Sequence, residues 1–255
     1  MGGKNGYDRG ILEVFSLLWG DGFLSPGAER SIRTLCEGLD LRGKRALEFG
    51  CGLGGPALLL AEKYGAHVTG IDLKRSFVES ARRRARERQL EQQTEFRVVE
   101  EGPLDFSDAS FDFVLNLGGA FIHTEDKTQI FADCFGVLRS GGTLGSYDWV
   151  TSDAGVTEGI RDFGASFGLH MESAKTHKTK LERAGFVDVE LTDDSEWYGA
   201  EAAHEVERLT GELYEQLCKR LGKAEADEVI AFWTDTTQLC RSGEIRQCFL
   251  RARRP

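Results

Sequence analysis

A glycine-rich run near residue 50 contains the residues whose types and spacing best suit chemistry. From Leu47 to Gly55 the chain reads Leu-Glu-Phe-Gly-Cys-Gly-Leu-Gly-Gly, and a later Gly-Ile-Asp ends at Asp72. Glycines in a turn between a strand and a helix let backbone N–H groups approach a ligand closely. An acid that ends the next strand can accept hydrogen bonds from both hydroxyls of a ribose. The spacing therefore indicates a site for a nucleoside-containing cofactor.

Glu48 separates two interpretations of this turn. Gly50, Gly52 and Gly55 satisfy the dinucleotide pattern G-x-G-x-x-G, so the glycines alone also suit an NAD(P)-dependent oxidoreductase. A carboxylate two residues before the first glycine would repel a pyrophosphate but attract the ammonium of a methionine-like group. We therefore expect S-adenosylmethionine, with NAD(P) as the alternative. Against that alternative, neither Tyr64 nor Tyr147 has a lysine four residues later.

Polar residues also occur at the predicted ends of later strands, where open α/β sheets bind ligands. Glu100 and Glu101 follow the third strand, where an acid can accept from an adenine amino group, and Asn116 and Leu117 end the fourth, beside the adenine. The expected cofactor contacts are Glu48, Gly50, Cys51, Gly52, Gly54, Asp72, Leu73, Glu100, Glu101, Asn116 and Leu117.

Alternating strands and helices are predicted to position these residues. Strands are expected at 45–49, 67–71, 95–99, 111–116 and 143–148, and helices at 55–64, 76–89 and 127–138. Such alternation predicts an α/β fold with a doubly wound, mostly parallel sheet covered by helices on both faces.

The remaining segments are predicted to form a cap and the last strands. Helices are expected at 157–167, 172–184, 201–221 and 224–240, and strands at 186–191 and 247–252. Two N-terminal helices, the second at about 28–39, precede the sheet. We expect N-terminal cap helices in 1–40 and a catalytic domain in 41–255, with helical insertions at about 155–185 and 201–240.

Composition limits the classes of partner. The 255 residues have a formal net charge of −10, which disfavours non-specific binding to nucleic acid. The six cysteines include no C-x-x-C pair, so no metal site is expected. We expect these cysteines to be reduced thiols in a cytoplasmic protein. No apolar run is long enough to span a bilayer, and the N-terminus lacks a signal-peptide core. The oligomeric state cannot be inferred.

With these motifs, the chain resembles class I S-adenosylmethionine-dependent methyltransferases. The resemblance adds Asp108-Ala-Ser-Phe-Asp112 and Leu138-Arg-Ser-Gly-Gly-Thr-Leu144 to the glycine turn and Gly-Ile-Asp. It covers about residues 25–194 and the terminal strand. It implies a seven-stranded, Rossmann-like sheet whose last strand is antiparallel, and methyl transfer from S-adenosylmethionine.

A narrower resemblance is to phosphoethanolamine N-methyltransferases. It rests on Tyr7, on the segments 19–27 and 62–67, and on Ala120-Phe-Ile-His123. In that family a tyrosine and a histidine close over the methyl group, so the resemblance implies that Tyr7 and His123 are catalytic.

The chain departs from this family at the residues that would hold phosphate. Gly118 and Gly119 replace an Arg-Asp pair, Trp149 replaces a tyrosine, and no Arg-x-Tyr occurs between residues 160 and 174. The basic residue expected near Trp233 is also missing. Because a phosphate dianion needs cationic partners, we expect a less anionic acceptor.

We expect methylation of a small molecule, at the nitrogen of an amine. O- or C-methylation of an aromatic or prenylated molecule stays open, as does a cofactor-binding protein without turnover. The expected acceptor-site residues are Trp19, Phe23, Ser25, Tyr147 and Trp149. Aromatic walls suit a cationic amine or a flat apolar molecule equally well. Acidic residues from Glu190 to Glu207, including Glu205, suit either a solvated surface or an entrance that attracts cations.

Overall fold

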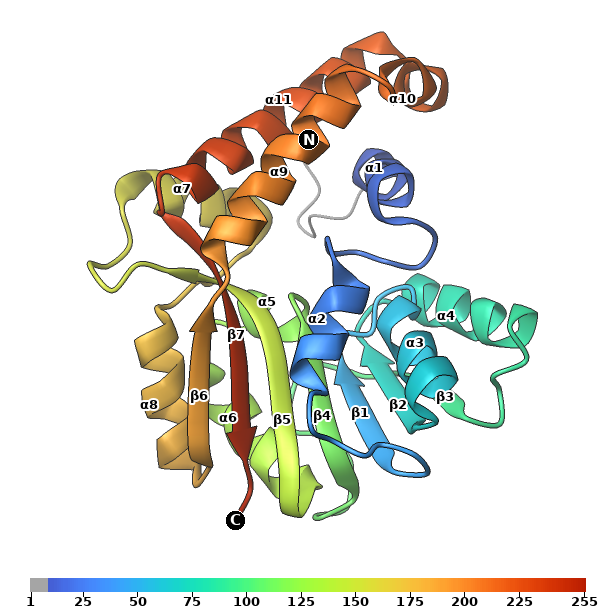
Figure 1. Cartoon of the computed structure of the whole chain (residues 1–255), viewed down its shortest axis with the longest axis vertical. Coiled ribbons are helices and arrows are strands. Elements are labelled where there is room, and N and C mark those ends of the chain that lie inside the picture. Colours follow the sequence, from blue (N-terminus) through green and yellow to red (C-terminus); the bar gives the residue numbers. More distant parts are fainter. Residues whose placement is uncertain (1–8) are drawn as a thin grey trace.

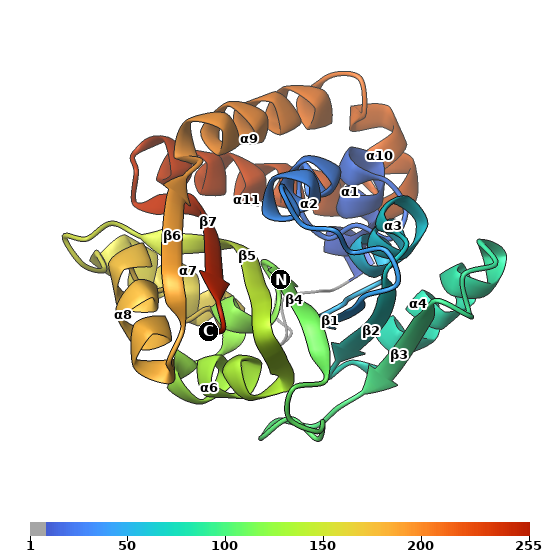
Figure 2. The same ribbon diagram turned by 60° about the horizontal axis from the view of Figure 1, so that its bottom comes forward.

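A mixed sheet forms the centre of the molecule (Figure 1). The computed structural model describes residues 9–255, and these form seven strands in the order β3-β2-β1-β4-β5-β7-β6. Only β7 runs antiparallel, to both of its neighbours. The strands are β1 (Arg45–Phe49), β2 (His67–Asp72), β3 (Thr94–Val98), β4 (Phe111–Leu117), β5 (Leu138–Thr151), β6 (Val187–Asp193) and β7 (Ile245–Arg253). The predicted fold class is confirmed, and Figure 2 shows β3 and β6 at the two edges.

Helices cover both faces of this sheet. On one face α2, α3 and α4 contribute Ile32, Leu58 and Val78 to one buried cluster, and on the other α6 and α8 contribute Phe131 and Leu181 to a second. The helices are α1 (Arg9–Trp19), α2 (Ala28–Leu35), α3 (Gly55–Tyr64), α4 (Arg75–Glu87), α5 (Ala120–His123), α6 (Lys127–Val137), α7 (Glu158–Phe167), α8 (Ala174–Ala184), α9 (Ser195–Thr210), α10 (Tyr214–Leu221) and α11 (Lys223–Arg241).

The helix after the glycine turn shows how local sequence sets an element. Gly54 precedes α3 with φ 88°, Pro56 lies in its first turn, and Gly65 ends it with φ 67°. Glycine adopts positive φ without strain, and proline suits a first helical turn. Both β1 and α3 therefore have their predicted bounds, and the turn between them is fixed.

A cap of four helices lies beyond the carboxyl ends of the parallel strands (Figure 1). Helices α1, α9, α10 and α11 share a separate hydrophobic cluster that includes Val14, Leu209, Leu217 and Val229. The cap combines the first described helix with three helices inserted between β6 and β7. It encloses space above the strand ends, where the candidate site residues gather.

Two predicted elements differ clearly from the observed ones, and one observed helix was not predicted. The single helix expected at 201–221 is wrong, because α9 starts at Ser195 and the chain breaks at Gly211 before α10. Strand β5 is longer than its predicted 143–148, and the short helix α5 was not predicted. Helix α2 packs against the sheet, in the same hydrophobic cluster as α3 and α4. Of the two N-terminal helices, only α1 therefore belongs to the hydrophobic cluster of the cap helices. The division at residue 40 stays a prediction.

Among residues 9–255, no helix combines the length and apolar character that crossing a bilayer requires. The six cysteines are free thiols, five of them buried. Within the same part of the chain, no group of His, Cys, Asp or Glu side chains is arranged to hold a metal ion.

Candidate active site

The glycine turn is covered by the loop between α1 and α2. The N–H of Gly55 donates to the carbonyl of Gly22 at 3.0 Å. A Cβ on Gly52, which has φ 50°, would lie 2.5 Å from Cδ1 of Leu24. The loop is tied to α4 by an ion pair between Asp21 and the buried Arg84. Close approach of the loop to the turn therefore depends on the absence of side chains there.

Asp72 organises the same turn from the end of β2. Its two carboxylate oxygens accept from the backbone N–H of Gly52 at 2.9 Å and of Lys74 at 2.8 Å. Each carboxylate oxygen retains further lone-pair capacity, which two ribose hydroxyls can use. Leu73 is 53% exposed beside it and offers an apolar surface to a flat base.

Glu48 carries a buried polar atom that lacks a partner. The residue is 2% exposed, and none of the described residues hydrogen-bonds its Oε2. Burial raises the pKa of the Glu48 carboxyl well above its ordinary value of 4.5, while a hydrogen bond from the Ala57 backbone opposes the rise. A bound ammonium group would supply the missing partner and restore the ionised form. The site therefore fits the amino-acid end of S-adenosylmethionine, as the sequence predicts.

We expect Glu48→Gln to weaken binding of S-adenosylmethionine by roughly 1.5–3 kcal/mol, the scale of a charge-assisted hydrogen bond. The variant should also remove a pH dependence of stability. A carboxyl whose pKa rises on folding loses its stabilising contribution as pH increases from 4.5 toward the raised value. Calorimetry with the cofactor and urea unfolding at pH 5 and 8 measure the two effects. Unchanged cofactor affinity would contradict the ammonium contact.

Four further predicted cofactor residues, after β3 and at the end of β4, differ in their burial. Glu100 and Glu101 are exposed after β3, and Leu117 is half-buried. Asn116 is fully buried, and its amide nitrogen donates to Asp148 at 2.7 Å and to Ser146 at 3.0 Å. The prediction that Asn116 flanks the adenine stays untested, but its side chain is already engaged inside the protein.

Asn116 instead supports the helix that carries His123. Its Oδ1 accepts from the N–H of Ala120 at 3.0 Å, at the start of α5. His123 ends this helix, and its Nδ1 lies 3.1 Å from the carbonyl of Gly168. A carbonyl only accepts, so this bond places the imidazole proton on Nδ1 and leaves Nε2 as the basic nitrogen. His123 is exposed to the cavity, and desolvation by the surrounding protein together with the nearby Lys74 lowers its pKa below 6.5, although the Gly168 bond acts in the opposite direction.

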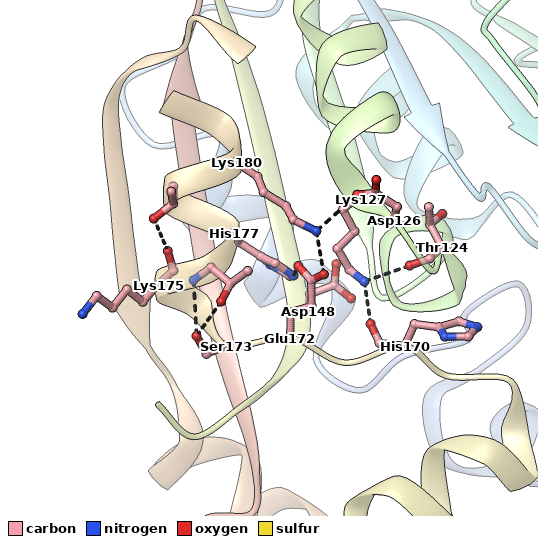
Figure 3. Close-up of polar contacts among 12 residues, drawn as sticks. Thr124, Asp126, Lys127, Asp148, His170, Glu172, Ser173, Lys175, His177 and Lys180 are labelled. Atoms are coloured by element: carbon pink, nitrogen blue, oxygen red, sulfur yellow. Dashed lines mark hydrogen bonds and ion pairs between the residues drawn. The ribbon is translucent and has the colours of Figure 1, made fainter. Parts of the chain in front are cut away.

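A buried polar network holds the two segments that flank His123 (Figure 3). Lys127, which is 1% exposed, donates to the carbonyls of Thr124 and His170. The backbone N–H of His170 donates to the carbonyl of Ile122 at 2.7 Å. Burial raises the pKa of the neighbouring Asp148 to about 7, and the charge of Lys127 opposes that rise. Neither Lys127 nor Asp148 was predicted from the sequence to be buried.

A cavity of about 150 Å³ lies between the strand ends and the cap. His123 and Gly118 after β4, Tyr147 and Trp149 on β5, and Trp19 on α1 all contribute to its wall. Among the described residues that line it, none is a lysine or an arginine. This composition agrees with the expectation of a less anionic acceptor.

Four of the five predicted acceptor residues border this cavity, namely Trp19, Ser25, Tyr147 and Trp149. Phe23 does not; its ring lies against Gly55, where a Cβ would come within 2.9 Å of it. Tyr7 lies outside the described residues, so its predicted role stays a prediction.

Glu205, for which the sequence left open a solvated surface or an entrance that attracts cations, also lines the cavity. A solvated position was one of its two expected settings, yet the residue is 3% exposed. Its oxygens accept from the indole N–H of Trp19 at 2.5 Å and of Trp233 at 3.0 Å. Glu205 lies three residues after the buried Ala202 and four before the buried Leu209, and this helical spacing is the sequence signal for its inward position.

Known proteins match this arrangement. Residues 46–142 match a family model described as a methyltransferase domain. The chain is 28% identical over 236 residues to phosphoethanolamine N-methyltransferase 1 of Arabidopsis thaliana, covering 92% of this chain and 47% of that protein. It is 29% identical over 237 residues to 27-O-demethylrifamycin SV methyltransferase of Amycolatopsis mediterranei, covering 86% of each. The chain thus spans about half the length of the plant relatives that it matches.

Solved structures share the fold. Phosphoethanolamine N-methyltransferase 2 of Haemonchus contortus, in complex with phosphomonomethylethanolamine and S-adenosylhomocysteine, superposes with a TM-score of 0.88. It is 20% identical, over 96% of this chain and 57% of that one. Fold, site and the matched domain at residues 46–142 are similar to those of class I S-adenosylmethionine-dependent methyltransferases. Within that class, the chain resembles the phosphoethanolamine N-methyltransferases.

Proposed function

We propose that this protein transfers a methyl group from S-adenosylmethionine to the nitrogen of a small, non-phosphorylated amine. The observation that supports the proposal most is the cavity beside His123, which has aromatic walls and no lysine or arginine among its described lining residues. An aromatic wall attracts an amine cation, whereas a phosphate dianion would find no cationic partner in it.

The chain's residues have three tasks in this proposal. Glu48 and Asp72 orient the two ends of the cofactor, which supplies an electrophilic methyl group when bound. The cavity aligns the acceptor and excludes bulk water. The Nε2 of His123 accepts the proton that the attacking amine loses, because the Gly168 carbonyl keeps the other proton on Nδ1.

Oxygen or carbon acceptors form the second candidate. The relative from Amycolatopsis mediterranei is named for a 27-O position, and it matches this chain over most of both lengths. An aromatic cavity also suits a flat apolar molecule. A base at His123 would serve a phenol or alcohol in the same way.

Incubation with radiolabelled S-adenosylmethionine and three acceptor panels tests the proposal. One panel contains small amines, another small phenols and alcohols, and the third contains phosphoethanolamine. We expect label on amines and none on phosphoethanolamine. Transfer to phenols or alcohols alone would establish the second candidate. Cofactor binding without transfer to any panel would contradict both.

A further inference from the structure

The cap end of the cavity contains a buried carboxylate within a group of aromatic rings. Glu205 projects from α9, and Trp19 from α1 and Trp233 from α11 donate to its two oxygens. Phe15 stacks on Trp19 with ring centroids 4.3 Å apart, and the rings of Trp19 and Trp233 lie 5.9 Å apart. The carboxylate and these three aromatic side chains all line the same cavity.

The charge of Glu205 lacks a close protein partner among the described residues. No lysine, arginine or histidine of that part of the chain forms an ion pair with it. Arg208 acts on it only electrostatically from a distance, because its guanidinium contacts Glu212 at 2.8 Å and the Leu18 carbonyl at 3.3 Å. Burial raises the pKa of Glu205, and the two indole donors oppose that rise. Buried charges in proteins are normally paired, so this carboxylate has unused capacity for a cation.

The geometry leaves room for that cation. A carboxylate has about four acceptor positions, and the two indoles use two of them. Indole and phenyl faces attract an alkyl-substituted ammonium through their quadrupoles, most strongly where water is excluded. Carboxylate and rings therefore favour the same kind of group.

We propose that Glu205, Trp19 and Trp233 form a subsite for a positively charged, alkyl-substituted ammonium group of the acceptor. The proposal deepens the proposed function and rests on it, since it takes this cavity as the acceptor site. The subsite lies in the cap, apart from the glycine turn, so it selects the acceptor without contacting the cofactor residues Glu48 and Asp72.

Binding of tetramethylammonium and of tert-butanol, a neutral molecule of similar size, tests the subsite without any variant. We expect the cation to bind about thirtyfold more tightly in ligand-observed NMR, the scale of a desolvated cation–π contact. Calorimetry with S-adenosylhomocysteine on the same sample tests the cofactor site. Equal affinity for the two probes, or binding of neither, overturns the proposed subsite. If S-adenosylhomocysteine still binds in that case, the proposed function is not contradicted. Loss of cofactor binding instead contradicts the proposed function.

Two variants assign the preference to the carboxylate charge. Glu205→Gln removes the charge with little change in size and should abolish the preference for the cation. Trp19→Phe removes one indole donor but keeps the carboxylate, and it should retain most of the preference. A Gln variant that still prefers tetramethylammonium contradicts the role of Glu205. If the Gln variant does not fold, the two-probe comparison on the wild type still decides.

Discussion

The His123→Asn variant is expected to lose about 100-fold or more in kcat, the contribution typical of a positioned general base. Asparagine can still donate to the Gly168 carbonyl, but it has no basic nitrogen. Affinity for S-adenosylmethionine should change little. Wild-type kcat/KM should fall in acid, below the ordinary histidine value of 6.5, because the pKa of His123 is lowered and only the neutral ring accepts a proton. Steady-state kinetics from pH 5 to 9 measure both effects.

His170→Asn is the matched control for that experiment. His170 lies on the neighbouring segment after α7 and contributes its backbone, rather than its side chain, to the bonds with Ile122 and Lys127. It should behave as the wild type. A wild-type rate in His123→Asn, or an acid limb that persists in that variant, would remove His123 from the proposed mechanism.

The second large effect is expected at Asp72. Asp72→Ala should weaken binding of S-adenosylhomocysteine by about 1–3 kcal/mol, the scale for losing hydrogen bonds to a charged group. Calorimetry measures the affinity directly. Asp188→Ala is a suitable control, since Asp188 is an exposed acid on β6 that pairs with Arg253 at the far side of the sheet.

An analogue without ribose hydroxyls separates two causes of that loss. Asp72 also holds the backbone of Gly52 and Lys74, so its removal can act through the turn. If Asp72 binds the ribose, the analogue binds the wild type weakly and loses little more in Asp72→Ala. An equal loss for cofactor and analogue would show that Asp72 acts only on the turn.

The cofactor half of the fold was predictable because its signals are local. Glycines that must adopt positive φ mark the turn after β1, and polar residues lie near the carboxyl ends of three parallel strands, namely Glu48 in β1, Asp72 in β2 and Asn116 in β4. Both β1 and α3 have the predicted bounds, and β2 extends one residue further, to Asp72. The conformation of these glycines follows from backbone sterics, so their spacing in the sequence is enough to predict the turn.

The acceptor half depends on contacts between distant segments and could be predicted only in part. Aromatic residues such as Trp19 and Trp149, which the sequence grouped together, border one cavity although they are 130 positions apart. Burial of Lys127 and Asp148 was not predicted, since each resembles a surface charge until its partners on other elements are known. Four-residue α5 has too few turns to show a helical period.

The insertion of α9–α11 between β6 and β7 has a consequence for divergence and engineering. The two strands are direct neighbours, and the Asp194 N–H bonds to the Gln247 carbonyl at 2.8 Å where the inserted segment leaves and rejoins the sheet. An inserted segment whose two ends are adjacent can change in length or sequence without shifting the register of the strands on either side. Exchange of this one continuous stretch should therefore transplant acceptor preference between related enzymes, while cofactor binding around Glu48 and Asp72 stays intact.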